Sequence, residues 1–215
     1  VSFKKRSTKT DGQRAKERDT KLRTQQYIFD RVQAVKVGQV YQASKVEETI
    51  RELYKTGLFT SIEPQVTGSQ TDPNARNVEF IVTERPTTTI NGSISYGTSV
   101  GLVGELKLAD SNFLGKGQDA AITLSASNKG DKTFDISWFD PWIRGTERVQ
   151  AGGTIYWNVS VDDNADPDEV EKVKKIGTRW TIGKGLNSDL YVRMAARYDH
   201  YEELFANKKV NDKYN

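Results

Sequence analysis

The chain has 215 residues, which is enough for one or two domains, and it contains no cysteine. The lack of cysteine excludes a disulfide framework, a thiolate metal site and a cysteine nucleophile. The net charge of +3, from 32 basic and 29 acidic residues, gives no indication of a nucleic-acid partner.

Residues 1–85 read as a small mixed domain that opens with a short strand. Thr24–Val35 has apolar residues at helical spacing, and Thr24 is positioned to cap that helix. Ser44 and Glu47 have the spacing of a capping box at the start of a second helix. Gly57 is placed to end this helix in the left-handed conformation.

Two strands are expected after the second helix. The first, Phe59–Val66, contains Pro64, which has no N–H group and therefore indicates an edge strand or a bulge. Val78, Phe80 and Val82 alternate on the second. The domain order is therefore strand, helix, helix, strand, strand, with the helices covering one face of a three-stranded sheet.

From Arg85 onward the pattern is that of antiparallel strands, with apolar residues at every second position. About seven strands are predicted, with no helix to cover their apolar face. They are Thr88–Thr98, Gly101–Asp110, Gln118–Ser127, Lys132–Phe139, Arg148–Val161, Lys175–Gly183 and Asp189–Tyr198.

The missing helical cover leaves two architectures. A soluble sandwich would bury the apolar face against a second sheet, whereas a membrane barrel would turn it to lipid and the charged face to a wet lumen. Aromatic residues near the strand ends, such as Tyr96, Trp138 and Tyr198, suit the interfacial belts of a barrel. The pattern favours the barrel. If the first domain is periplasmic, the long acidic connection Asp162–Lys174 lies on the outer side.

No motif for catalysis or cofactor binding is present. The only histidine, His200, has the setting of a surface residue at a strand end, and neither a nucleophile elbow nor a phosphate-binding loop occurs. The sequence therefore predicts no enzyme activity, no catalytic residue, no cofactor and no metal site.

Several motifs in a fixed order then resemble one family. The first domain closes with Val82-Thr83-Glu84-Arg85-Pro86, the first long strand carries Ser95-Tyr96-Gly97-Thr98, and two turns follow. The turn residues are Asn112, Phe113, Gly115, Gly117, Asp140, Pro141, Trp142 and Gly145. In these features the chain resembles the BamA-type outer-membrane assembly and translocation superfamily, in which periplasmic POTRA domains precede a C-terminal β-barrel.

The resemblance implies an α+β POTRA domain at residues 1–85 and the N-terminal portion of an outer-membrane barrel at residues 86–215. Family barrels have about sixteen strands, so seven would form an incomplete barrel in one chain. Either the chain is a fragment of a longer one, or two short chains close one barrel as a homodimer.

The resemblance also implies a role, which is to receive unfolded outer-membrane clients at the POTRA domain and to template strand insertion at a lateral gate. The implied gate strand holds Ile90, Gly92, Ile94, Tyr96 and Gly97. The implied client-binding edge of the POTRA domain holds Phe59, Ile62, Gln65 and Val66. The glycines of the gate strand would either weaken strand pairing or simply serve barrel tilt and curvature.

The implied partners are unfolded outer-membrane client proteins, assembly-complex lipoproteins or periplasmic chaperones, and outer-membrane lipid. Three alternatives stay open. The chain would be the POTRA-barrel tail of an exported enzyme such as a patatin-like phospholipase, a transporter of the two-partner-secretion type, or a soluble interaction module with the sheet as its scaffold.

Overall fold

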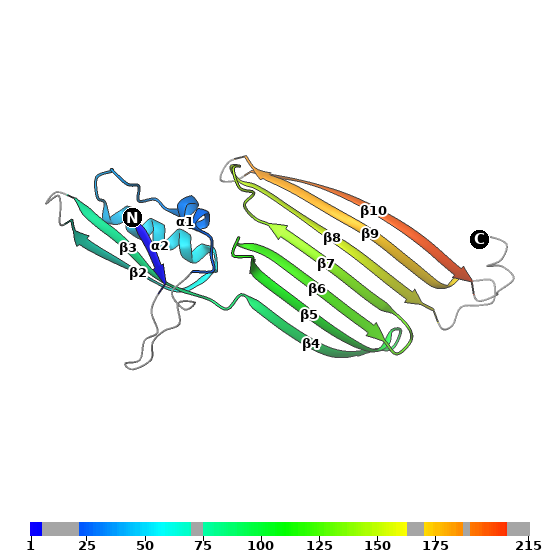
Figure 1. Ribbon diagram of the computed structural model, residues 1–215. Helices are drawn as coiled ribbons and strands as arrows, with labels where there is room; N and C mark the ends of the chain where they lie inside the picture. Colours follow the sequence, from blue (N-terminus) through cyan, green and yellow to red (C-terminus); the bar gives the residue numbers. More distant parts are fainter. Residues whose placement is uncertain (6–21, 70–74, 163–169, 187–189, 206–215) are drawn as a thin grey trace, which may run out of the picture. The chain divides into compact units, whose positions relative to one another are not determined.

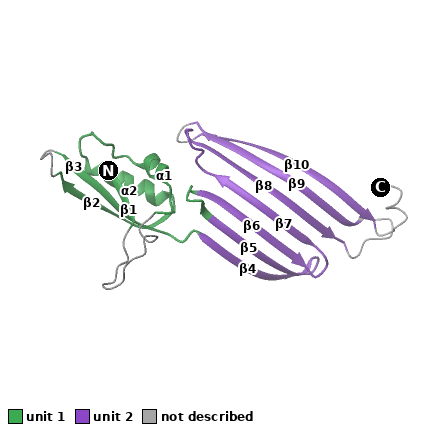
Figure 2. Cartoon of the chain, viewed as in Figure 1, with its two compact units in different colours: residues 1–87, 111–117 green, residues 88–110, 118–215 purple. Residues whose placement is uncertain are grey.

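A computed structural model describes residues 1–5, 22–69, 75–162, 170–186 and 190–205. The chain forms two compact units, shown in Figure 2. The first comprises residues 1–87 together with 111–117, and the second comprises residues 88–110 and 118–215. In the described part of the chain, no helix has the length and apolar character needed to cross a membrane.

The first unit is a three-stranded sheet with two helices. Its elements are β1 (Ser2–Lys5), α1 (Gln26–Val32), α2 (Ala43–Lys55), β2 (Phe59–Gly68) and β3 (Arg76–Glu84), which confirms the predicted order. The strand order is β1-β3-β2, with β1 parallel and β2 antiparallel to β3 (Figure 1). Both helices supply buried side chains to the core.

The core of the first unit is small and aromatic. The ring of Phe3 contacts those of Phe29 and Phe80, with centroid distances of 4.5 and 5.1 Å. Phe59 packs on Phe29 with a centroid distance of 5.4 Å. Leu53, on α2, is fully buried with them. The alternation predicted for β3 is confirmed because Val78, Phe80 and Val82 are all buried.

Both predicted helix caps are wrong. The N-cap residues are Gln25 and Gln42, and neither makes a side-chain capping bond. Thr24 lies before the helix and binds Glu84 instead, and Ser44 is already inside α2. The hydroxyl of Thr24 donates to Glu84 and accepts from Asn112, so distant partners take the place of a helix N–H, which a capping pattern cannot anticipate.

The ends of the elements in the first unit follow the prediction more closely. Gly57 has a φ of +72°, the left-handed conformation expected just after α2. The strand with Pro64 is an edge strand, the first of the two alternatives expected for β2, whereas its one register shift lies between Phe59 and Ser61 and not at the proline.

The second unit is one antiparallel sheet of seven strands that follow each other in sequence order, β4 to β10, as Figure 1 shows. The sheet is not closed among the described residues, because β4 and β10 each pair on one side only. The strands are β4 (Thr88–Gly97), β5 (Gly101–Phe113), β6 (Gln118–Ser127), β7 (Lys132–Asp140), β8 (Val149–Val161), β9 (Val170–Gly185) and β10 (Tyr191–Phe205).

The last two strands are longer than predicted. β9 begins five residues before Lys175, and β10 continues past Tyr198 to Phe205. Their extension pairs Lys174 with Glu202, whose charged groups lie 3.2 Å apart. Part of the predicted acidic outer connection is therefore strand, and residues 163–169 of it lie outside the described residues.

Four glycines of β8 and β9 lie beneath aromatic rings. A Cβ atom built on Gly153 would lie 2.6 Å from the ring of Trp180, and one on Gly152 would lie 2.9 Å from Phe139. Tyr156 covers Gly177, and Tyr191 covers Gly183. Rings that cover strand glycines are a known means of fixing register in curved sheets.

Candidate functional site

The predicted gate strand, β4, is an edge strand of the seven-stranded sheet. It pairs with β5 over its whole length, from Thr88 opposite Asp110 to Gly97 opposite Gly101. No other described strand pairs with its second edge. Ile90, Ile94 and Tyr96 are 72–80% exposed, all on the apolar face. Within the described part of the chain, the outer edge of β4 therefore lacks a strand partner, the arrangement that accepts an added strand.

The two glycines of β4 have different surroundings. A Cβ atom on Gly92 would meet only the carbonyl oxygen of Glu105, at 4.0 Å, so this position has free space. A Cβ atom on Gly97 would lie 3.0 Å from Val100 at the end of the hairpin. Gly97 thus serves the turn, while Gly92 leaves a gap in the apolar face.

The second predicted edge, β2, is also an edge strand, but its four predicted residues are not equivalent. Phe59 and Ile62 are 2% and 6% exposed and belong to the core. Gln65 is exposed, and Val66 is 40% exposed. Of these four residues, only Gln65 and Val66 therefore offer side chains to a partner.

Part of the β2 backbone is already occupied. The N–H of Ile62 donates to the hydroxyl oxygen of Tyr54, on α2, at 3.2 Å. Pro64, two residues further, has no N–H to donate. Along β2 these features leave the segment from Val66 to Gly68 as the part most open to strand addition.

The turn between β5 and β6 is closed by the side chain of Asn112. Its Oδ1 accepts the N–H of Gly117 at 2.7 Å, and its carbonyl oxygen accepts the N–H of Gly115 at 2.8 Å. Gly115 has a φ of +72°, and a Cβ atom there would lie 2.0 Å from the carbonyl oxygen of Arg23. Gly115 is therefore required both by its backbone conformation and by the close approach of another segment.

That segment, Arg23–Tyr27, connects the turn to the end of β3. Asn112 Nδ2 donates to Thr24 Oγ1 at 3.0 Å, and Thr24 Oγ1 donates to Glu84 Oε1 at 2.6 Å. The N–H groups of Thr24 and Arg23 donate to the two oxygens of Glu84, at 2.7 and 3.0 Å. Thr24 and Asn112 are 4% and 3% exposed, so the centre of the network is buried, while its Arg23 end is exposed.

Two further hydrogen bonds attach the same segment to the turn. The N–H of Gln25 donates to the carbonyl oxygen of Gly115 at 2.8 Å. The hydroxyl of Tyr27 donates to the backbone carbonyl oxygen of Lys116 at 2.8 Å. The sequence motifs around Glu84 and around Asn112 thus meet in one buried network within the first unit.

The other predicted turn, between β7 and β8, is organised by Asp140. Its Oδ1 accepts the N–H of Trp142 at 2.7 Å, and its Oδ2 accepts the side-chain amide of Gln118 at 2.6 Å. Gln118 in turn accepts the indole N–H of Trp138 at 3.2 Å. Gly145 has a φ of +81°, and nothing lies within 4 Å of its would-be Cβ, so its backbone conformation is what requires glycine.

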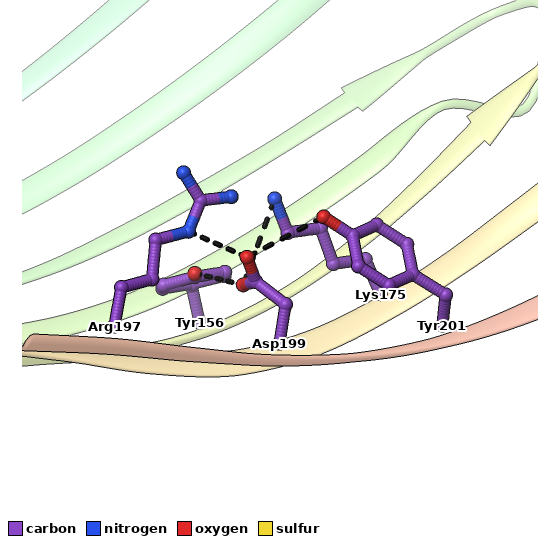
Figure 3. Close-up of polar contacts among 5 residues, drawn as sticks. All are labelled: Tyr156, Lys175, Arg197, Asp199 and Tyr201. Atoms are coloured by element: carbon purple, nitrogen blue, oxygen red, sulfur yellow. Dashed lines mark hydrogen bonds and ion pairs between the residues drawn. The ribbon is translucent and has the colours of Figure 1, made fainter.

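A third polar cluster, on the polar face of β8–β10, was not predicted (Figure 3). Asp199 accepts hydrogen bonds from Tyr156 and, at 3.4 Å, from Tyr201. Its carboxylate also lies 2.5 Å from Nε of Arg197 and 3.7 Å from Nζ of Lys175. Tyr156 and Asp199 both stand opposite a glycine of β9, and Figure 3 shows their side chains meeting above that strand.

The sequence contained a signal for only part of this cluster. Gly177 interrupts the polar side of β9, and a tyrosine and an aspartate occupy the registered positions on the two neighbouring strands. This relationship depends on strand register, which periodicity within one strand does not define. For Thr24 the sequence predicts a helix cap, whereas its hydroxyl donates to Glu84.

Comparisons with known proteins agree with these features. The model of the Omp85 superfamily domain matches residues 112–215, and the POTRA model, described as a surface antigen variable number repeat, matches residues 19–85. The outer membrane protein assembly factor BamA of Neorickettsia risticii is 23% identical over 172 residues, which are 80% of this chain and 22% of that protein. A putative outer membrane protein assembly factor of Treponema pallidum is 24% identical over 130 residues, 57% of this chain and 15% of that protein.

A solved structure shows the same fold. The crystal structure of BamA from Haemophilus ducreyi lacking POTRA domains 1–3 superposes with a TM-score of 0.72 and 20% identity, over 85% of this chain and 34% of that one. The chain thus spans about a fifth of the length of the first of these curated relatives. Together the two family models and the shared fold support a BamA-type member of the Omp85 superfamily, in which a POTRA domain is followed by seven strands of an incomplete β-barrel.

Proposed function

We propose that this chain is part of a non-enzymatic factor that inserts outer-membrane proteins, and that client strands add to the free edge of β4. The observation that carries the proposal is the edge itself. β4 is ten residues long, pairs with one strand only among the described residues, and has exposed apolar side chains at Ile90, Ile94 and Tyr96. An incoming strand gains main-chain hydrogen bonds there, and its own apolar side chains continue the membrane-facing surface.

The POTRA domain supplies a second, weaker edge. The segment Val66–Gly68 of β2 is exposed, and on the edge away from β3 it has no strand partner among the described residues. We propose that an extended client segment, or a partner such as a periplasmic chaperone or an assembly lipoprotein, adds to it before reaching β4. The names of the two curated relatives, both assembly factors, support an assembly role for the whole protein.

Cross-linking tests the β4 assignment. The full-length protein would carry a photoactivatable residue at Asn91 or Ser93 of β4, with Ser137 of the central strand β7 as the matched control. Stalled client chains are expected to cross-link from both β4 positions and not from Ser137. Equal cross-linking from β4 and β7 would show that clients do not select this edge.

The fate of the client separates assembly from transport. If the protein is an insertion factor, the cross-linked client is recovered in the membrane after chasing. Recovery of the client outside the cell would instead favour a transporter of the two-partner-secretion type.

A further inference from the structure

The apolar face of the second unit contains a groove that crosses five strands, from β4 to β8. Its volume is about 910 Å³, and its walls include Leu106, Leu124, Phe134 and Trp157. These four side chains are 36–49% exposed, so they face the groove without filling it. Their positions alternate with polar residues of the opposite face, which places the groove on the side that meets lipid.

Glycines make the groove. Gly92 lies on the apolar face of β4, and Gly104 lies on the same face of β5. Gly92 pairs with Leu106 and Ile94 pairs with Gly104, so the two glycines are diagonal neighbours across the strand pair. A Cβ atom on Gly104 would have nothing within 4 Å, and one on Gly92 would meet only a carbonyl oxygen at 4.0 Å. Packing within the sheet therefore does not require glycine at either position, and neither glycine has a positive φ.

One cation lies at the outer end of this groove. Lys132 begins β7, shares the apolar face with Phe134, and is exposed. It follows the β6–β7 turn, at the end of the sheet opposite to the β5–β6 turn, which clusters with the periplasmic domain. Lys132 therefore lies at the outer membrane–water boundary, where a lysine can extend its ammonium group to the head groups.

We propose that the groove binds an acyl chain of an anionic phospholipid, with its phosphate against Lys132. The occupant follows from the chemistry of the walls and from charge complementarity. The groove surface is mainly apolar and faces hydrocarbon, and the lysine at its end attracts a phosphate. This inference rests on the membrane location of the sheet and does not depend on the proposed client-binding role.

The test uses full-length protein in bilayers that contain a photoactivatable phosphatidylglycerol with a diazirine in its acyl chain, and phosphatidylcholine with the same chain as the neutral comparison. Labelled peptides are mapped by mass spectrometry. We expect phosphatidylglycerol to label the β5–β7 peptides about fivefold more than phosphatidylcholine, the factor that one lysine near an anionic head group supplies. Equal labelling by the two lipids overturns the proposal.

Two variants and one control complete the design. Lys132→Gln is expected to reduce phosphatidylglycerol labelling to the phosphatidylcholine level. Gly104→Leu is expected to displace label from the groove although Lys132 is retained, and Ala196→Leu, on the apolar face of β10, is expected to change nothing. Labelling that is insensitive to both groove variants also overturns the proposal. Native mass spectrometry of unmodified protein and Lys132→Gln, counting retained phosphatidylglycerol, gives a second measurement that requires no photoactivatable lipid; fewer retained lipids in Lys132→Gln are expected, and equal numbers overturn the proposal.

Discussion

The side-chain amide of Asn112 donates a 3.0 Å hydrogen bond to Thr24 Oγ1, although the two residues are 88 positions apart in the chain. The hydroxyl of Thr24 in turn donates a hydrogen bond to Glu84, at the end of β3. A turn between two long strands is thereby joined to the helical side of the POTRA domain through buried polar groups. Buried networks of this kind are stable only while every member keeps its partner.

Replacing Asn112 should therefore be costly. Asn112→Ala removes the acceptor of the Gly117 N–H and the donor to Thr24, and we expect a loss of about 1–3 kcal/mol in the free energy of unfolding. Urea unfolding of the protein in detergent measures it, with the exposed Asn91→Ala as the control. Equal stability of the two variants would contradict a structural role for the network.

Tyr54 protects one donor of the β2 edge. Tyr54→Phe removes the hydroxyl that accepts the Ile62 N–H, so we expect hydrogen exchange at the Ile62 amide to become about fivefold faster, the factor that corresponds to a typical hydrogen bond. Exchange at Val78, in the core of β3, serves as the internal control. An unchanged Ile62 exchange rate would mean that the tyrosine does not cover the edge.

We expect the pairing of the short parallel strand β1 to be sensitive to acid. A hydrogen bond from Lys4, with Nζ–Oε1 2.7 Å, and a second from Ser2 lower the pKa of Glu79. A lowered folded-state pKa contributes stability above the pKa of the unfolded chain, and this contribution disappears as the pH falls through the folded-state value. We expect a small loss of stability in that acid range, because Glu79 lies at the surface.

The measurement is the urea midpoint as a function of pH. Glu79→Gln should remove this part of the acid dependence and leave the neutral-pH slope unaltered. An acid dependence that persists in full in Glu79→Gln would assign it to other carboxylates.

Gly177 makes room for the hydrogen bond between Tyr156 and Asp199. A Cβ atom there would lie 2.4 Å from Asp199 Oδ1 and 2.7 Å from the tyrosine hydroxyl. Gly177→Ala should displace both side chains and cost about 1.5 kcal/mol, as should Tyr156→Phe, since both remove one bond to a charged group. Thermal unfolding followed by gel mobility would show this loss, with Gly104→Ala as the open-space control.

The double variant distinguishes this account from simple crowding. If both substitutions act on the same hydrogen bond, Gly177→Ala with Tyr156→Phe costs about as much as either alone. Additive losses would show that the glycine is needed for another reason.

Local patterns explain which features were predictable. Alternation in β4–β8 is a property of each strand by itself, so those strands were found nearly to their ends. The extensions of β9 and β10 carry charge on both faces and are held by pairing, as between Lys174 and Glu202, which no single-strand pattern reveals. The hydrogen bonds of Thr24 with Glu84 and Asn112 join three segments that are distant in sequence. The local sequence around Thr24 predicts only a helix cap, so it does not reveal these partners.

The client-binding residues themselves stay predictions. Exposure divides the predicted β2 set, since Phe59 and Ile62 are in the core, whereas Gln65 and Val66 are accessible. On β4 the backbone edge matters more than side-chain identity, because strand addition is a main-chain interaction.

A proline scan of β4 tests the central claim most directly. Proline removes one N–H, and successive N–H groups of a strand point alternately to β5 and to the free edge. Full-length protein with proline at each of residues 91–94 would be assayed for the rate at which it inserts an outer-membrane client into liposomes, with gel mobility reporting the folded barrel. The account predicts that two alternate positions lose insertion while the barrel stays folded. If every variant that folds inserts the client at the normal rate, clients do not pair with β4.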